Sequence, residues 1–377
     1  MNRRHLLIAS AGGLALRSHA LNFANRPAPF PIRAEVDRIV DIAVGIRPFR
    51  AAGPRLALER HGSKALVHHY GHGGSGWSLS WGSAQAAMGL VAASGVRPGE
   101  RIAVVGCGAI GLTTARTAQQ AGLKVRLYAQ ARPPQVHSSA ATGLWTPDSR
   151  IVTTEHATQR WAAGWEAMAR ASFRVHQSYL GLPSAPVSWH DGYVVADQDF
   201  DSPLPHYGQT PEPDYPDLQD RLAHLRPGSE PVPAGEHPFG TRAVRRFTQM
   251  VFNIPAYQRL LWEDFLREGG EWVPRTFRDG KELTTVAERT VVNCTGDAAR
   301  TLYADVHMTP VRGQTARLIP QPEVDYAVIY RGQNCVALPR RDGLLVAATG
   351  AHDFGSADLR PDRAQAEAAV QRLAQLF

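Results

Sequence analysis

Runs of apolar residues alternate with stretches in helical spacing along the chain. The clearest unit spans residues 101–130. An apolar run at 102–105 predicts a strand, a helical pattern follows, and alternating apolar positions at 125–129 predict a second strand. Gly122 stands where a glycine often ends a helix. The pattern predicts a strand, helix and strand unit of a parallel sheet.

Similar patterns recur on both sides of this unit. Strands are predicted at 39–45, 65–70, 193–196 and 344–348, and helices at 81–93, 255–267 and 362–377. The helix that starts near Pro255 has proline in its first turn and Gly269 just beyond its end, as many helices do. Strands and helices therefore alternate in the first half, whereas strands with one exposed face dominate the second.

Three glycines stand between the first strand and the helix of the 101–130 unit, in the spacing Gly-x-Gly-x-x-Gly. In this context they allow a tight turn, close approach of the backbone to a pyrophosphate, and close packing of the helix on the strand. The residues predicted to hold the pyrophosphate are Gly106, Gly108, Ala109, Ile110 and Gly111. The alternative is a glycine-rich turn without a ligand. The acidic residue expected about twenty positions on, for a ribose hydroxyl, falls near the uncharged Gln130.

A second glycine-rich turn, at 71–76, leads towards the predicted helix at 81–93. Exposed amides and the positive end of a helix would face an electron-rich ligand there. The alternative is a flexible loop. His72 lies between glycines in this turn, and we expect it to cap the loop, with a general base as the other interpretation.

The length and composition are those of an ordinary globular protein. At 377 residues we expect two domains. The formal charge is +7, but the basic residues are scattered, which indicates a solvated surface and no nucleic-acid partner. Three cysteines without a CxxC pair predict buried thiols, with no disulfide framework and no metal site.

The first 20 residues have the features of an export leader. A charged start is followed by an apolar run and by small residues before a possible cleavage site after Ala20. Arg3 and Arg4 resemble the pair of a twin-arginine leader, which exports folded proteins, although His5 stands where an apolar residue is usual. The run is too short for a stable membrane anchor. We expect a signal peptide at 1–20 and a periplasmic or secreted protein without a membrane span.

Residues 197–240 are rich in Pro, Asp and Gly and show little periodicity. So long an irregular stretch in a compact domain is usually either functional or disordered. We weigh two interpretations of it, an active-site cover and a plain surface loop.

Six separate blocks together resemble the D-amino-acid oxidase family of FAD enzymes. They are VGIRP at 44–48, HYGHGGSGWSLSWGSA at 69–84, VVGCGAIGLTTA at 104–115, SSAATGLWTP at 138–147, VVNCTG at 291–296 and PVRGQTARL at 310–318. Several of the blocks are long, and together they cover most of the chain after the leader. The resemblance implies that the cofactor is FAD.

The order of the blocks differs from that of the family. The blocks at 44–48 and 69–84 close the family's chain, whereas here they precede the first glycine turn. We interpret this as a circular permutation, in which residues 94–100 join the family's last helix to its usual beginning. Such a rearrangement is tolerated where the former termini lie close together. We therefore expect Phe377 and the segment near Arg33 to be neighbours.

The resemblance also implies an α/β fold with two domains. One is a Rossmann-like FAD-binding domain, and the other is a substrate domain with a mostly antiparallel sheet. We assign 21–150, which includes the permuted blocks, to the FAD-binding domain and expect 285–302 to complete it. The substrate domain takes 151–284 and 303–377.

By resemblance, two further groups of residues surround the FAD beyond the first glycine turn. The block at 138–147 would line the ribityl chain and the flavin. The second glycine turn would approach the pyrimidine end, where amides at a helix start stabilise negative charge. The residues concerned are Ser138, Ser139, Ala141, Gly143, Gly73, Gly74, Ser75, Gly76 and Trp77.

Arg47 is the candidate catalytic residue. In the family, the arginine of the matching Gly-x-Arg-Pro block binds the substrate carboxylate, which suits a planar bidentate donor. The alternative is a surface arginine. Gly74 is expected in the same substrate pocket. We place the family's active-site tyrosines at 239–247, where this chain has none.

Two residues of that stretch, Arg245 and Phe247, are therefore expected to line the substrate pocket. With Arg246 they would reshape it for a different and acidic substrate. The other interpretation is that amino-acid specificity has been lost.

The implied reaction is hydride transfer from Cα of an amino acid or related amine to FAD. It gives an imino acid that hydrolyses to a keto acid, and orientation supplies most of the acceleration, with no protein base required. Electrons pass to oxygen or, in a dehydrogenase, to a quinone or carrier. The remaining alternatives are a non-catalytic flavin-binding protein of the same fold and a nicotinamide enzyme, which would leave the blocks at 69–84 and 291–296 without a role.

Overall fold

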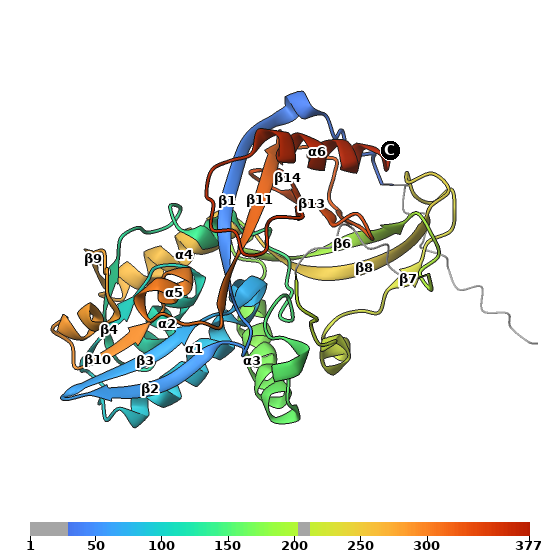
Figure 1. The fold of residues 1–377 in the computed structure, drawn as a ribbon. Coiled ribbons are helices and arrows are strands. Elements are labelled where there is room, and N and C mark those ends of the chain that lie inside the picture. The colour runs from blue at the N-terminus through green and yellow to red at the C-terminus, as the bar shows by residue number, and fades with distance from the viewer. Residues whose placement is uncertain (1–28, 203–211) are drawn as a thin grey trace, which may run out of the picture.

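Two sheets organise the chain, in a computed structural model that describes residues 29–202 and 212–377 (Figure 1). The smaller sheet has six strands. In spatial order they are β2 (Arg55–His61), β3 (Lys64–Tyr70), β10 (Thr290–Asn293), β4 (Arg101–Val105), β5 (Lys124–Ala129) and β9 (Glu271–Pro274). All are parallel except β2, which forms a hairpin with β3. Four of the five β4 residues are buried, as expected of a central parallel strand.

Helices cover the smaller sheet. They are α1 (Gly76–Ala93), α2 (Ala109–Gln120), α3 (Gln159–Gln177) and α4 (Ile254–Arg267). α1 packs between α2 and α3, and the four helices and the sheet share one large apolar core. The other face carries a smaller core around Val105 and Leu283. The sheet is therefore a middle layer, as in dinucleotide-binding folds.

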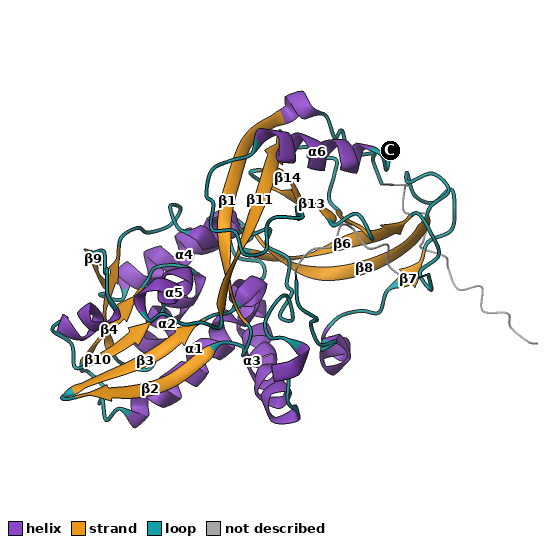
Figure 2. Ribbon diagram, in the orientation of Figure 1, coloured by secondary structure: helices purple, strands orange, loops and turns teal. Residues whose placement is uncertain are grey.

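The larger sheet has eight strands. In spatial order they are β1 (Ile39–Arg50), β11 (Met308–Leu318), β14 (Gly343–Ala348), β13 (Cys335–Arg340), β12 (Ala327–Tyr330), β6 (Val187–Ala196), β8 (Ala243–Phe252) and β7 (Glu230–Pro231). Only β12 and β6 pair in parallel. Helix α6 (Arg363–Ala374) packs on β11, β13 and β14 (Figure 2).

Short helical turns connect these elements. They are η1 (Val36–Arg38), η2 (Gly73–Ser75), η3 (His137–Ala140), η4 (Thr154–His156), η5 (Gln219–Leu225), η6 (Gly280–Thr285), η7 (Gly296–Ala298) and the four-residue α5 (Ala299–Leu302). No helix within the two described stretches combines the length and the apolar character needed to cross a membrane.

Strand β1 brings the two sheets together. It belongs to the larger sheet, yet its end bridges to the second glycine turn through Phe49 and His72, and it contacts η3 and η7 (Figure 1). The larger sheet therefore reaches the carboxyl ends of the parallel strands, the usual place for a ligand in such a sheet.

The predicted fold class is confirmed: a mixed α/β chain with a parallel sheet and a second, mostly antiparallel sheet. The chain passes between the two sheets more often than the predicted domain limits imply. β1 lies in the larger sheet although it falls within 21–150, and β9 joins the smaller sheet although it falls within 151–284. β10 lies within 285–302 and occupies the centre of the smaller sheet.

The predicted helix at 81–93 begins earlier, at Gly76, because η2 leads directly into it. Glycine and serine are weak helix formers, so this first turn is not evident from the sequence. At the other end of the chain, Ile32 and Leu376 share one apolar cluster. The segment near Arg33 and the C-terminal helix therefore lie together. The signal peptide predicted at 1–20 lies outside the described residues.

Candidate cofactor and substrate site

A cavity of about 340 Å³ lies where β1 meets the carboxyl ends of β4, β5 and β10. Its walls come from the first glycine turn, η3, the second glycine turn, β1 and the segment after β10. The residues that sequence reasoning had assigned and that line it are Arg47, Gly73, Gly74, Gly76, Trp77, Gly106, Gly108, Ala109, Ile110, Ser138 and Ala141. Five sequence blocks that are far apart in the chain thus meet at one cavity.

Two glycines of the first turn, Gly106 and Gly111, leave no room for a side chain. Gly106 has a φ of 107°, which favours glycine, and a Cβ there would collide with the carbonyl oxygen of Cys294. Gly108 caps α2, so the amides at the start of that helix face the cavity. Gly111 does not line the cavity. A Cβ at Gly111 would collide with the carbonyl oxygen of Gly106, so this glycine lets the helix pack closely on the turn.

Segment η3 is tied to both glycine turns through Ser138. The Ser138 hydroxyl accepts a hydrogen bond from the Ala109 amide at 3.0 Å. The backbone carbonyl of Ser138 accepts another from Nε1 of Trp77, also at 3.0 Å. Ser139 and Gly143, predicted near the flavin, do not line this cavity. Ser139 donates to the side chain of Gln258 at 2.9 Å and lines a neighbouring cavity.

The second glycine turn is held against residues 149–150. The Gly74 amide and the Ser75 hydroxyl both donate to the carbonyl oxygen of Ser149, at 3.0 and 2.9 Å. Gly73 has a φ of 53°, and a Cβ there would collide with the carbonyl oxygen of Arg150. Ser75 is buried beneath the turn and does not line the cavity. The turn is therefore packed and not a flexible loop.

Arg47 enters the cavity from β1. Its Nη1 donates to the carbonyl oxygen of Arg312 at 2.9 Å, and its guanidinium lies against Gly313, which has no side chain to displace it. Burial, and then the charge of Arg150, lower the pKa of Arg47 to about 10, against the opposing influence of Asp353 and Glu212. Within the described chain no carboxylate forms an ion pair with Arg47. A partly buried cation without a carboxylate partner favours an anionic ligand.

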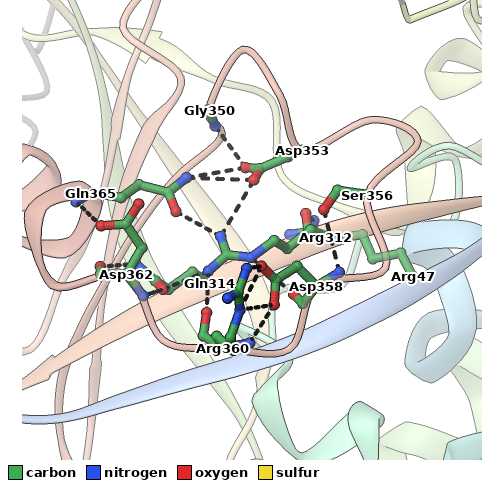
Figure 3. Close-up of polar contacts among 10 residues, drawn as sticks. All are labelled: Arg47, Arg312, Gln314, Gly350, Asp353, Ser356, Asp358, Arg360, Asp362 and Gln365. Atoms are coloured by element: carbon green, nitrogen blue, oxygen red, sulfur yellow. Dashed lines mark hydrogen bonds and ion pairs between the residues drawn. The ribbon is translucent and has the colours of Figure 1, made fainter.

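Arg312 holds the segment beside Arg47 (Figure 3). Its buried guanidinium donates five hydrogen bonds, which use all of its N–H groups. The acceptors are the carbonyl oxygens of Asp358 and Arg360 and the side chains of Asp353, Gln365 and Gln314. Only Asp353 carries an opposing charge. The five hydrogen bonds of its side chain hold Arg312 in place, and its carbonyl oxygen, which accepts from Arg47, is therefore held in place as well.

Part of the irregular segment 197–240 also approaches Arg47. Arg150 donates from Nε and Nη2 to the two oxygens of Glu212, at 2.9 and 2.7 Å, and the Tyr215 hydroxyl donates to Glu212 at 3.0 Å. Burial alone would raise the pKa of Glu212, but the bonds and charge of Arg150 outweigh it and lower that pKa. The Tyr215 ring meets Phe49 edge-on at 5.7 Å.

Arg245 and Phe247, predicted for the substrate pocket, lie on β8 and line neither this cavity nor its neighbour. Arg245 donates to Ser229 at the sheet edge, and Arg246 pairs with Glu230. The Phe247 ring covers Gly192 on the next strand.

Sequence reasoning missed several residues that line the cavity. They are Gly45, His137, Arg275, Phe277, Asp297 and Gly313. The recognised blocks could have indicated three of these residues, because Gly45 and Gly313 lie within a block and Asp297 directly follows one. Arg275 and Phe277 follow β9 and reach the site only through the packing of the sheet, which no local pattern shows. Gln130, at the end of β5, also lines the cavity.

The cavity fits a flavin dinucleotide. Amides at the start of α2 suit a pyrophosphate. An added Cβ at Gly76 or Gly108, which both line the cavity, would meet no protein atom closer than 3.5 Å, so these two glycines leave open space for a ligand. All three cysteines are buried, as predicted. Burial raises the pKa of Cys107 and of Cys294 to about 12, so neither thiol is a ready nucleophile.

Comparisons with known proteins point to the same cofactor. The family model described as FAD dependent oxidoreductase matches residues 101–377. The D-amino-acid oxidase of Rubrobacter xylanophilus is 27% identical over 280 residues, which cover 73% of this chain and 77% of that protein. The D-amino-acid oxidase of Streptomyces coelicolor is 30% identical over 292 residues, which cover 74% of this chain and 78% of that protein.

A solved structure, L-proline dehydrogenase from P. horikoshii, aligns with a TM-score of 0.47 at 13% identity, covering 74% of this chain and 77% of that one. The family match spans more than half of the chain, and the cavity has the glycine turns and helix start that a flavin dinucleotide requires. The chain belongs to the family of FAD-dependent oxidoreductases that includes the D-amino-acid oxidases, and its cofactor is FAD.

Proposed function

We propose that this chain oxidises an amino acid, or a closely related amine with one carboxylate, to an imino acid that hydrolyses to a keto acid. The observation that carries the proposal is Arg47, a partly buried guanidinium in the cavity that no carboxylate of the described chain neutralises. A substrate carboxylate would supply the missing charge. When bound, FAD supplies the acceptor for the hydride that leaves Cα.

The residues around Arg47 would orient the substrate. Arg47 has one N–H bonded to the chain, which leaves donors for a bidentate contact with a carboxylate. Gly73 and Gly74 keep the backbone close to the cavity, so an amino acid held at Arg47 lies against that turn. Holding the reacting atoms in line is the main contribution expected of the protein.

The charges near Arg47 favour a substrate with one carboxylate. Arg150 is neutralised by Glu212, and Arg312 is paired with Asp353. One positive charge is left over, on Arg47. An amino acid with a neutral amine and a neutral side chain brings one negative charge, whereas a dicarboxylic amino acid brings two. Arg245 and Arg246, which had indicated an acidic substrate, lie elsewhere on β8.

The test is production of keto acid and ammonia from a panel of D- and L-amino acids, with Arg47→Lys as the variant. Lysine keeps the charge but loses the planar fork, so kcat/KM should fall by about 100-fold or more, given the strength of hydrogen bonds to charged groups. Arg97→Lys, in the exposed loop before β4, is the matched control. Equal activity of Arg47→Lys and wild type would overturn the proposal.

Oxygen and an artificial acceptor, compared in the same assay, separate an oxidase from a dehydrogenase. Hydrogen peroxide formed with keto acid identifies oxygen as the acceptor. Turnover only with the artificial acceptor identifies a dehydrogenase. A protein that retains flavin and turns over no amino acid would be a flavin-binding protein without this activity.

We also propose that residues 1–20 direct export of the folded protein. The support is the sequence pattern alone, with Arg3 and Arg4 ahead of an apolar run. A protein that acquires FAD before leaving the cytoplasm requires a route for folded cargo. A fusion of residues 1–20 to a reporter, with Arg3 and Arg4 changed to lysine, should lose export. Unchanged export of that variant would remove the twin-arginine interpretation.

The order of the blocks is, in our proposal, a circular permutation of the family's chain. Two observations support it. The family match begins at residue 101, the start of β4, and Ile32 lies in one apolar cluster with Leu376. A rearranged gene encoding 101–377 followed by 29–94 should yield a folded protein that binds FAD. Failure to fold with linkers of several lengths would contradict the proposal.

A further inference from the structure

A line of buried polar side chains runs behind the second glycine turn. His72 Nε2 lies 2.6 Å from the Ser83 hydroxyl, and the same hydroxyl lies 2.7 Å from His69 Nε2. His69 Nδ1 lies 2.9 Å from the hydroxyl of Thr114 on α2. All four side chains are completely or almost completely buried. Their hydrogen bonds must therefore be satisfied by one another, by the backbone or by a ligand.

The direction of these hydrogen bonds is set by Thr114. Its hydroxyl oxygen lies 2.7 Å from the carbonyl oxygen of Ile110, one turn earlier in α2. A carbonyl oxygen has no proton, so the Thr114 hydroxyl must donate its single proton there. Towards His69, the Thr114 oxygen is then an acceptor, and His69 carries its proton on Nδ1.

The remaining protons follow in sequence. Burial, and then the neighbouring His72, lower the pKa of His69 well below its usual value, and burial lowers the pKa of His72 to about 3, so both rings are neutral. Since His69 carries its proton on Nδ1, its Nε2 accepts from the Ser83 hydroxyl. The Ser83 oxygen in turn accepts from His72, whose proton therefore lies on Nε2.

One group is left over at the end of the line. His72 Nδ1 is a lone-pair acceptor with no hydrogen-bond partner in the described chain, and His72 is 1% exposed. The residue lines the FAD cavity next to Gly73 and Gly74. An unpaired buried acceptor destabilises the protein until a donor meets it.

We propose that His72 accepts, at Nδ1, a hydrogen bond from an N–H or O–H group of the bound flavin nucleotide. The line from Thr114 to Ser83 keeps His72 in the tautomer that accepts. Oxidised FAD offers such donors as the ring N3–H and the ribityl hydroxyls. The inference concerns cofactor binding, so it stands or falls independently of the proposed substrate.

The direct test is the 15N NMR spectrum of protein labelled at histidine, with the His72 signals assigned from their loss in His72→Asn. In the apoprotein, Nε2 should carry the proton and Nδ1 should show the shift of a free lone pair. Addition of FAD should move the Nδ1 resonance to that of a hydrogen-bonded acceptor. A proton on Nδ1, or no change on adding FAD, would overturn the proposal.

Two further arms identify the donor. FAD methylated at N3 lacks the ring donor, so a persisting shift assigns the donor to the ribityl chain, and a lost shift assigns it to the ring. Either result supports the proposal. A shift that occurs only when an amino acid is added to the holoenzyme would instead place the donor on the substrate and contradict it.

Matched variants test the line without touching the cavity. Ser83→Ala removes the acceptor of His72, and Thr114→Val removes the acceptor of His69. Each should raise the dissociation constant of FAD by about 3- to 10-fold, the effect of one net hydrogen bond. The controls are Ser80→Ala and Thr113→Val, which are equally buried, lie on the same helices and bond to backbone oxygens.

The dissociation constants can be measured by quenching of flavin fluorescence on binding to the apoprotein. Wild-type values for Ser80→Ala and Thr113→Val, with weaker binding by Ser83→Ala and Thr114→Val, would support the line. Equal affinities for all four variants would overturn it. Thermal denaturation of the four apoproteins separates a loss of folding from a loss of binding.

Discussion

Replacing Gly313 with alanine should disable Arg47 while leaving the fold intact. Gly313 lies on β11, opposite Gly45 of β1. An added Cβ would lie 2.5, 2.7 and 2.8 Å from Nη1, Cζ and Nη2 of Arg47. Ordinary contacts begin near 3.4 Å, so the guanidinium must move by about 1 Å. Its bond to the Arg312 carbonyl would then be stretched or lost.

The expected effect is large on catalysis and small on stability. A displacement of about 1 Å of a substrate-positioning group lowers the rate by about 100-fold. The atoms that move are the end of a flexible side chain, and the φ of Gly313 is not in the left-handed region, so the free energy of unfolding should change by less than about 1 kcal/mol.

The assay is kcat/KM for the best amino acid together with flavin content and thermal denaturation. Gly164→Ala is the control, because Gly164 lies in α3 and an added Cβ would meet no atom within 4 Å. A Gly313→Ala protein that keeps its FAD and has a kcat/KM within about twofold of wild type would refute the role of Arg47. Loss of FAD with normal activity after reconstitution would refute it as well.

Four further outcomes follow from the site and its buried groups. Arg312→Lys should raise KM by about 10-fold with unchanged FAD affinity in steady-state and binding assays, because lysine cannot supply five fixed donors. Glu212→Gln should lower KM for dicarboxylic relative to neutral amino acids, since it leaves a cation unneutralised. Burial lowers the pKa of His72 and His176 to about 3, from 6.5 when unfolded, so the unfolded state binds more protons in this range. The free energy of unfolding should therefore fall as the pH is lowered from 6.5 to 3, by about 1.4 kcal/mol per pH unit for each histidine. In denaturation experiments at pH 5 and pH 7, His176→Gln should show a smaller difference in unfolding free energy than the wild type, because the contribution of one histidine is missing. Arg47 keeps its guanidinium charge although burial lowers its pKa, so the dissociation constant of a simple carboxylate should stay the same between about pH 7 and pH 9 in a binding titration.

Local patterns predicted the two glycine turns and the strands and helices that carry them. The turns are short and depend on glycine at positions such as Gly106 and Gly73, where the backbone or its neighbours exclude a side chain. Arg47 was found only because it lies in a recognised block. Its burial and its contact with Gly313 depend on the pairing of β1 with β11, which are more than 250 residues apart.

Other parts of the site depend on long-range contacts that carry no local signal. Glu212 lies within the Pro-, Asp- and Gly-rich sequence at 197–240, and nothing in the sequence near it indicates that it neutralises Arg150. Arg245 illustrates the opposite case, because its position in the sequence indicated a pocket, whereas the register of β8 places it near Ser229 at the sheet edge. The tautomer of His72 likewise depends on a hydrogen bond within α2.

The central claim is that an amino acid held at Arg47 reduces the flavin. The most direct test is the absorption spectrum of the purified holoenzyme, recorded without oxygen as D- and L-amino acids are added. We predict that at least one amino acid with a single carboxylate bleaches the flavin bands, and that Arg47→Ala keeps the bands and is not bleached. Flavin bands that persist with every amino acid, or that bleach equally fast in Arg47→Ala, would contradict the account.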